Sequence, residues 1–178
     1  MNKTKILNLT YIALFAAVIA VCSYIQIPLV VPFTMQTYGV MTALGLLGGK
    51  RGTAAITAYV LLGMVGVPVF AGFNAGVQYV MGPTGGFIVG FILTGIVFWL
   101  ITHYFPKINT IIAFCVSLSV CYIFGVLWFC AVYLKAFDVG RAFTACVLPF
   151  IIPETLKILL SAATVKAVKK YIKNGANR

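Results

Sequence analysis

Four long runs of mainly apolar residues constrain this chain more than any other feature of its sequence. They cover residues 6–27, 87–103, 111–134 and 142–165. A helix over the first run would be about 33 Å long, enough to cross the roughly 30 Å hydrocarbon core of a bilayer. Charged residues make up 8% of the chain, whereas soluble domains carry about 25%. We therefore expect an integral membrane protein that crosses the bilayer several times.

Two shorter apolar segments, 38–47 and 53–65, lie on either side of the basic sequence Gly-Gly-Lys-Arg-Gly. As helices they would be only about 15 Å and 20 Å long, so neither crosses the bilayer at full thickness. We predict two short helices joined by a tight turn, because short or broken helices in transporters tend to flank a binding site. With the four long runs, they predict an all-α, polytopic membrane protein with six transmembrane helices in a single domain, residues 1–178.

Two apolar segments are unsuited to a continuous helix. Residues 28–37 contain Pro28 and Pro32, and residues 66–86 contain six glycines, two prolines and no charge. Proline breaks helices, and irregular backbone at membrane depth is tolerated only against protein or a cavity. We predict that both segments are irregular loops that lie against protein or a cavity.

The distribution of cations predicts how the chain crosses the membrane. With the N-terminus inside, ten cations fall on the inner side and three on the outer side. Cytoplasmic segments carry such an excess, so we predict that both termini are cytoplasmic and that both irregular loops lie outside. The inner cations are Lys3, Lys5, Lys50, Arg51, Lys107, Lys166, Lys169, Lys170, Lys173 and Arg178, and the outer ones are Lys135, Arg141 and Lys157.

Several classes of function are excluded or disfavoured by the same composition. The net charge of +11 comes from cations at segment ends, without a nucleic-acid-binding module, so we expect no nucleic-acid partner. The five cysteines form no C-x-x-C pair and the chain has one histidine, so we expect no metal site. We find no catalytic set of residues, so an intramembrane enzyme is disfavoured, and we expect no cofactor.

Glu154 is one of only two acidic residues in the chain, and it lies in an apolar segment three residues before Lys157. An ionisable side chain is costly there and marks a candidate functional site. One interpretation is a ligand-binding pair. The other is a carboxylate stabilised by the start of a helix and ion-paired with Lys157. A helix from Pro153 to the first cytoplasmic lysine would leave Glu154 about 12 Å below the outer boundary of the hydrocarbon.

Amide side chains in the predicted loops are further candidates. Asn74 and Gln78 lie in the Gly-rich loop, beside Tyr79, and Gln36 lies in the first loop. Such amides either cap loop backbone or hydrogen-bond a neutral polar ligand group, and an amide offers both a donor and an acceptor. A urea-like or amide-like ligand would suit them. A self-sufficient proton-coupled carrier remains an alternative, because Glu154 is a residue that can relay a proton.

Four motifs, in order along nearly the whole chain, resemble the BioY family, the biotin-binding S components of energy-coupling factor (ECF) transporters. They are VPFTMQT at 31–37, GMVGVPVF at 63–70, GPTGGF at 82–87 and PETLK at 153–157. The resemblance implies a six-helix S-component fold with an outward-facing biotin pocket, in the cell membrane of a prokaryote. It implies as partners a transmembrane coupling subunit and two ATPase subunits, which alone use ATP.

The resemblance also assigns roles to residues of this chain. It maps biotin binding onto Asn74, Glu154 and Lys157, with Gln36, Gln78 and Tyr79 as further positions. It maps contact with the coupling subunit onto the alanines of the first helix, whose fourfold spacing makes a smooth face. Those alanines are Ala13, Ala16, Ala17 and Ala20. The family commonly has aspartate at the position of Glu154, so the carboxylate here is about one methylene further from the backbone.

Overall fold

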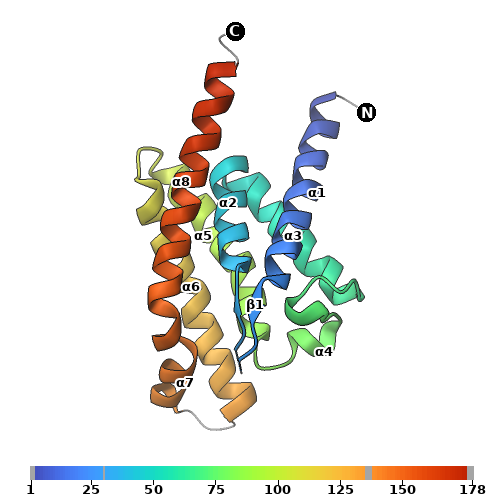
Figure 1. Ribbon diagram of the computed structural model, residues 1–178, viewed down its shortest axis with the longest axis vertical. Coiled ribbons are helices and arrows are strands. Elements are labelled where there is room, and N and C mark those ends of the chain that lie inside the picture. Colours follow the sequence, from blue (N-terminus) through green and yellow to red (C-terminus); the bar gives the residue numbers. More distant parts are fainter. Residues whose placement is uncertain (1–2, 30, 135–137, 176–178) are drawn as a thin grey trace.

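The computed structural model describes residues 3–29, 31–134 and 138–175, and nearly all of its elements are helices (Figure 1). Lys135 and Arg178, two of the cations used to predict the topology, lie outside the described residues. The elements are α1 (Lys3–Tyr24), β1 (Gln26–Ile27), β2 (Phe33–Thr34), α2 (Gln36–Leu47), α3 (Gly49–Val65), η1 (Ala71–Phe73), α4 (Val77–Val80), α5 (Gly85–Tyr104), α6 (Thr110–Phe129), η2 (Cys130–Leu134), α7 (Val139–Cys146), η3 (Leu148–Phe150) and α8 (Ile151–Gly175).

Four helical stretches are long and apolar enough to cross a membrane: Lys3–Tyr24, Gly85–Tyr104, Thr110–Leu134 and Val139–Gly175. They confirm a mostly helical, multi-pass membrane protein. The prediction of six spans remains a prediction, because α2 and α3 have only 12 and 17 residues. These two helices do confirm the predicted pair of short helices, which meet at Gly48, whose φ of 81° only glycine adopts easily.

The last apolar run, 142–165, forms two helices rather than the single one that the count of six helices assumes. The chain forms α7, a short 3-10 turn with Pro149, and then α8, which begins close to the start at Pro153 from which the depth of Glu154 was predicted. A residue before proline is disfavoured in helical geometry, which explains a break at this point. Helix α8 begins two residues before Pro153, whose missing N–H costs little in a first turn.

The end of the first apolar run and the first irregular segment together form a small antiparallel hairpin that the sequence did not predict. Strand β1 pairs with β2, with Gln26 opposite Thr34 and Ile27 opposite Phe33. The hairpin leads directly into α2, which begins at Gln36. It therefore fixes where the polar residues at the start of α2 lie.

The helices pack around a shared hydrophobic core. Helices α1, α2 and α3 contact one another, α5 packs along α6 and α3, and α8 lies against α2. Figure 1 places both termini, the α2–α3 turn and the α5–α6 connection at one end, and the hairpin, α4 and α7 at the other. The two loops predicted to be irregular, and the start of α8, therefore share one end of the molecule.

The alanines of α1 do not all lie on the surface. Ala13 and Ala17 are exposed, whereas Ala16 and Ala20 are buried in the core. Close approach of α1 and α2 beside these buried alanines is permitted by Gly39 of α2, which lies against the Cα atom of Ile19.

Candidate ligand-binding site

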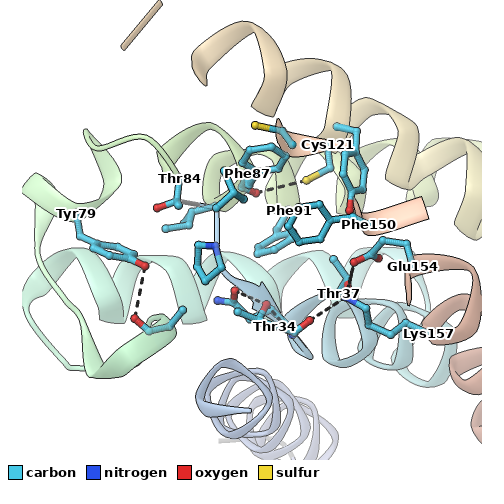
Figure 2. A pocket seen from close by; sticks show the side chains of 17 residues that line it. Thr34, Thr37, Tyr79, Thr84, Phe87, Phe91, Cys121, Phe150, Glu154 and Lys157 are labelled. Atoms are coloured by element: carbon cyan, nitrogen blue, oxygen red, sulfur yellow. Dashed lines mark hydrogen bonds and ion pairs between the residues drawn. The ribbon is translucent and has the colours of Figure 1, made fainter. Parts of the chain in front are cut away.

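A small pocket lies at the hairpin end of the bundle, between the start of α2, the helices α5 and α6, and the start of α8 (Figure 2). Its volume is about 60 Å³. One wall is apolar, and Phe87, Phe91 and Phe150 contribute aromatic rings to it. The opposite wall is polar. It is formed by Thr34, Gln36, Thr37, Glu154 and Lys157.

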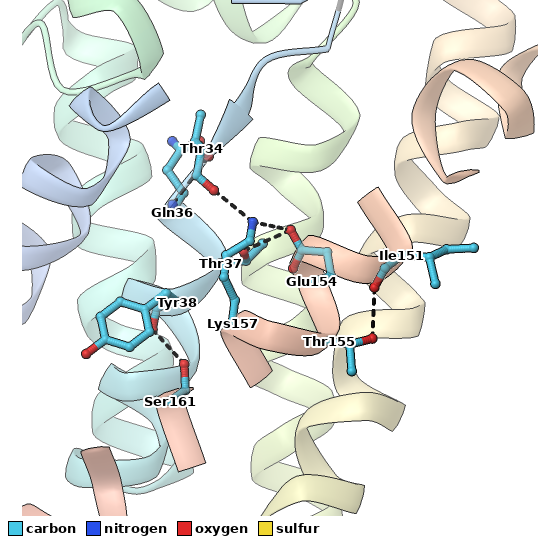
Figure 3. Close-up of polar contacts among 9 residues, drawn as sticks. All are labelled: Thr34, Gln36, Thr37, Tyr38, Ile151, Glu154, Thr155, Lys157 and Ser161. Atoms are coloured by element: carbon cyan, nitrogen blue, oxygen red, sulfur yellow. Dashed lines mark hydrogen bonds and ion pairs between the residues drawn. The ribbon is translucent and has the colours of Figure 1, made fainter. Parts of the chain in front are cut away.

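Lys157 is the centre of the polar wall (Figure 3). Its ammonium group donates to the backbone carbonyl of Thr34 at 2.8 Å, to Thr37 Oγ1 at 2.9 Å and to Glu154 Oε1. It also lies 4.5 Å from the centre of the Phe33 ring. The side chain is only 4% exposed. An ammonium group has three donors, so these oxygens satisfy it inside the protein and hold it in one position.

Glu154 has one oxygen engaged and one free. Oε1 accepts from Lys157 and, at 3.1 Å, from the Thr37 hydroxyl. Oε2 is fully buried and has no hydrogen-bond partner among the residues that the structure describes. A buried acceptor without a partner costs about 1–3 kcal/mol, and more when it is charged. The carboxylate is therefore poised to accept a hydrogen bond from a ligand in the pocket.

This arrangement bears on the two interpretations of Glu154. Glu154 lies in the first turn of α8 and pairs with Lys157, as the helix-start interpretation requires. The pair is also buried and lines a cavity, as the ligand-binding interpretation requires. A buried ion pair adds little net stability once its desolvation is counted. Its place on the pocket wall therefore favours a binding role.

Gln36 is oriented by partners on both sides of its amide group. Its Oε1 accepts from the Thr34 hydroxyl at 2.9 Å, and its Nε2 donates to the hydroxyl of Tyr59. Tyr59 is fully buried in α3. The sequence did not single out Thr37 or Tyr59. Thr37 stands next to Gln36 in the 31–37 motif, but only the fold brings Tyr59 to this amide.

Asn74 and Gln78 lie outside the small pocket, in an adjoining hollow of about 470 Å³ that we call the vestibule. Tyr79 lines both spaces, together with Pro32, Ala71 and Thr84. The Asn74 amide donates to the carbonyl of Ala71 at 2.7 Å, so its N–H₂ group caps the loop. Of the six predicted binding residues, the fold brings Gln36, Tyr79, Glu154 and Lys157 to the pocket.

A third space opens on the flank of the site. An apolar groove of about 560 Å³ runs between α6, α7 and α8 and shares Tyr122, Phe150 and Glu154 with the pocket. The exposed fractions of Ile123 and Phe143 along it, 62% and 45%, fit a surface that faces lipid. Within the described ranges, no group of three His, Cys, Asp or Glu residues lies close enough together to hold a metal ion.

Comparison with known proteins gives one consistent result. The BioY family model matches residues 1–174. The Thermotoga maritima protein named biotin transporter BioY is 36% identical over 159 residues, which cover 88% of this chain and 92% of that protein. Biotin transporter BioY2 of Lactococcus lactis is 37% identical over 167 residues, covering 90% and 88%.

A solved structure agrees with these relatives. The crystal structure of the S-component for biotin from an ECF-type ABC transporter superposes with a TM-score of 0.85 at 26% identity, and the match covers 96% of this chain and 94% of that one. The predicted resemblance is thereby confirmed over nearly the whole sequence, and this chain belongs to the BioY family.

Proposed function

We propose that this chain is the biotin-binding S component of an ECF transporter and acts as its substrate-capture subunit. The observation that carries the proposal is the buried pair of Glu154 and Lys157, which faces an aromatic wall in a pocket at the end opposite the termini. Its relatives are named as biotin transporters and not as enzymes. The chain binds and releases its ligand unchanged, with no cofactor of its own.

The chemistry of biotin fits this pocket. Biotin has a urea ring, a thioether ring, an aliphatic tail and a carboxylate. The free Oε2 of Glu154 suits a urea N–H, and the rings of Phe91 and Phe150 suit the thioether ring. Asn74 and Gln78 line the vestibule, whereas Glu154 lines the pocket that adjoins it. We therefore place the urea group inside and the tail carboxylate towards the vestibule.

Binding requires the two hollows to join. A volume of about 60 Å³ is well below the roughly 300–1,000 Å³ of ordinary ligand sites. Pro32, Ala71, Tyr79 and Thr84 stand between the pocket and the vestibule. A small outward shift of these loop residues merges the two spaces and admits the ligand from the outer side.

The test is biotin binding to the purified protein, measured by calorimetry. Replacing Glu154 by glutamine keeps the size of the side chain but removes the charged acceptor. Since a hydrogen bond to a charged group contributes about 1.5–3 kcal/mol, we expect the dissociation constant to rise at least about tenfold.

The matched control is Asp138→Asn, the same chemical change at the other acidic residue of the chain. Asp138 caps α7 and pairs with Arg141 on the exposed surface, so this variant should bind biotin as the wild type does. Unchanged affinity in Glu154→Gln would contradict the proposed site, and no biotin binding by the wild type would contradict the function.

The partners implied by this function are a transmembrane coupling subunit and two ATPases, which supply ATP hydrolysis. The exposed alanines Ala13 and Ala17 offer a smooth helix face for the coupling subunit. The charge distribution supports cytoplasmic termini in the plasma membrane of a prokaryote. We take residues 1–178 as a single substrate-binding domain with six membrane-spanning helices.

A self-sufficient proton-coupled carrier is the alternative, and the buried carboxylate of Glu154 is the observation that favours it. Uptake of biotin into liposomes distinguishes the two. An S component requires the ATPase partners and ATP for concentrative uptake, whereas a proton-coupled carrier accumulates biotin alone under a proton gradient.

A further inference from the structure

A further polar hollow lies at the opposite end of the molecule from the pocket. It has a volume of about 340 Å³ and lies between the α2–α3 turn and the last turns of α5. Lys50 and Arg51 line one side, and Trp99 and His103 line the other. The proposed biotin site uses none of these residues. We infer that this hollow binds the phosphate group of an anionic membrane lipid.

The charge of the hollow is not balanced by any acidic side chain of the protein. The chain has only two acidic side chains, Asp138 and Glu154. They belong to α7 and the start of α8, at the other end of the molecule (Figure 1). Lys50 and Arg51 therefore have no carboxylate side chain beside them. Basic hollows between membrane helices are suited to anionic lipid headgroups.

The position of Arg51 is fixed by the fold. Its Nε donates to the carbonyl of Leu47 at 3.1 Å, and its Nη1 donates to Asn8 Oδ1 at 3.0 Å. These bonds use two of the five N–H donors of a guanidinium group. They hold the group in place at the hollow, and its remaining donors match the geometry of phosphate oxygens.

The backbone of the α2–α3 turn adds to this cationic surface. Helix α3 begins at Gly49 after Gly48, which has no side chain with which to cap the helix. The first N–H groups of a helix lack partners within it. A Cβ atom on Gly49 would lie 2.5 Å from the Cα of Trp99, so glycine lets the start of α3 approach α5 and forms the wall of the hollow.

Aromatic residues place the hollow at the depth of the lipid headgroups. Trp99, Tyr104 and Phe105, at the end of α5, are 41%, 71% and 66% exposed. Tryptophan and tyrosine are enriched where a membrane protein meets the headgroup region. The hollow therefore opens at the level of lipid phosphates, and its lining is suited to them. The Thr102 hydroxyl already bonds carbonyls of α5, so we assign it no part in binding.

The test is a titration of the full-length protein in detergent with phosphatidylglycerol and, separately, with phosphatidylcholine, followed by native mass spectrometry. We expect the wild type to retain phosphatidylglycerol preferentially. In the double variant Lys50→Gln/Arg51→Gln, the dissociation constant for phosphatidylglycerol should rise about fivefold for each cation removed, about 25-fold in all. Lys50→Arg should retain the wild-type affinity because it preserves the charge.

The matched control is Lys166→Gln/Lys169→Gln, which removes the same charge from exposed positions of α8 at the same end of the molecule. It should change lipid affinity by less than about twofold. Equal losses in the two double variants would overturn the proposal, because the basic surface as a whole would then attract the lipid. Biotin affinity, measured on the same samples, should be unchanged in both and shows that the variants fold.

Two further outcomes would replace the lipid by another ligand. If soluble glycerol phosphate binds as tightly as phosphatidylglycerol, the hollow takes free phosphates and not lipids. If Lys50→Gln/Arg51→Gln keeps its affinity for phosphatidylglycerol but no longer assembles with the coupling subunit, the hollow belongs to a protein interface. Either result overturns the assignment to a lipid.

Discussion

At the scale of single residues, the site depends on side chains that hold other side chains in place. Lys157 is held by three oxygens, from Thr34, Thr37 and Glu154. Gln36 is held between Thr34 and Tyr59. Fixed partners reduce the conformational entropy that a binding group loses when a ligand arrives. In the proposed site, a residue outside the pocket lining, such as Tyr59, is therefore expected to contribute to the affinity for biotin.

Tyr59 allows this idea to be tested. Tyr59→Phe removes the acceptor for the Gln36 amide but keeps the buried ring, which packs against Phe70 at a ring-centre distance of 5.7 Å. We expect the biotin dissociation constant to rise about two- to tenfold, the value of one hydrogen bond of about 0.5–1.5 kcal/mol. Calorimetry on Tyr59→Phe, Gln36→Ala and the double variant measures the coupling between the two residues.

The control for this prediction is Tyr38→Phe, which removes a hydroxyl that interacts with Thr164 at 3.1 Å, outside the pocket. Its affinity for biotin should match the wild type. Additive effects of Tyr59→Phe and Gln36→Ala in the double variant would contradict a positioning role, because residues that act through one contact are not additive.

At the scale of elements, glycines decide how closely α5 and α6 approach. A Cβ atom on Gly86 would lie 2.3 Å from the Cβ of Trp128 and 3.2 Å from the Cα of Gly125. One on Gly90 would lie 2.8 Å from the Sγ of Cys121. Small residues at such positions let membrane helices pack closely. This close contact places Phe87 and Phe91 of α5 beside Cys121 of α6 in the pocket wall.

Gly86→Ala should therefore destabilise the protein. In an isolated helix alanine is more stabilising than glycine. At position 86, however, the added methyl group would clash with the Cβ and Cγ atoms of Trp128. Overpacking of this kind costs about 1–3 kcal/mol. We expect a lower midpoint of thermal unfolding in detergent, measured by the fluorescence of the two tryptophans.

Gly140→Ala serves as the control at this scale. The residue lies in the first turn of α7. The nearest atom to the added methyl group would be Asp138 Oδ1 at 3.5 Å, which is an ordinary van der Waals contact. Its unfolding midpoint should equal or exceed that of the wild type. If Gly86→Ala were as stable as Gly140→Ala, close packing would not hold α5 against α6.

At the scale of the whole molecule, the two ends differ in character. One end holds the pocket, the vestibule and both acidic side chains, whereas the other holds the termini and most of the cations. Helix α1 runs from the end with the termini towards the hairpin, and its residues Ala13 and Ala17 are exposed. The proposed ligand site and the proposed partner surface therefore lie on different parts of the molecule and should be separable by mutation.

Ala17→Trp tests this separation. Residue 17 is exposed on α1, so the indole does not disturb the core. It should block a closely packed partner helix and reduce copurification of the coupling subunit at least about tenfold, while biotin affinity is unchanged. Leu14→Trp, at a neighbouring position that is 53% exposed, should affect assembly much less. Normal assembly of Ala17→Trp would contradict a partner surface at this alanine.

Much of the protein was predictable from local patterns in the sequence. Long apolar runs and scarce charges identified a helical membrane protein, and glycines and prolines located the irregular loops. An acidic residue in an apolar segment identified Glu154 and its neighbour Lys157. These signals are local because the hydrocarbon of the bilayer favours apolar side chains and helical backbone in each segment separately, independently of how the helices pack.

Other features were decided only by tertiary packing. Nothing in the sequence places Tyr59 at the amide of Gln36, Thr37 against Glu154, or Asn74 in a vestibule apart from the pocket. Nor does it divide the alanines of α1 into a buried and an exposed pair. Such contacts join residues far apart in the chain, and they depend on the register and approach of packed helices. The composition of the sequence therefore determined that the chain lies in a bilayer and that its fold is helical. Tertiary packing determined which polar atoms contact one another.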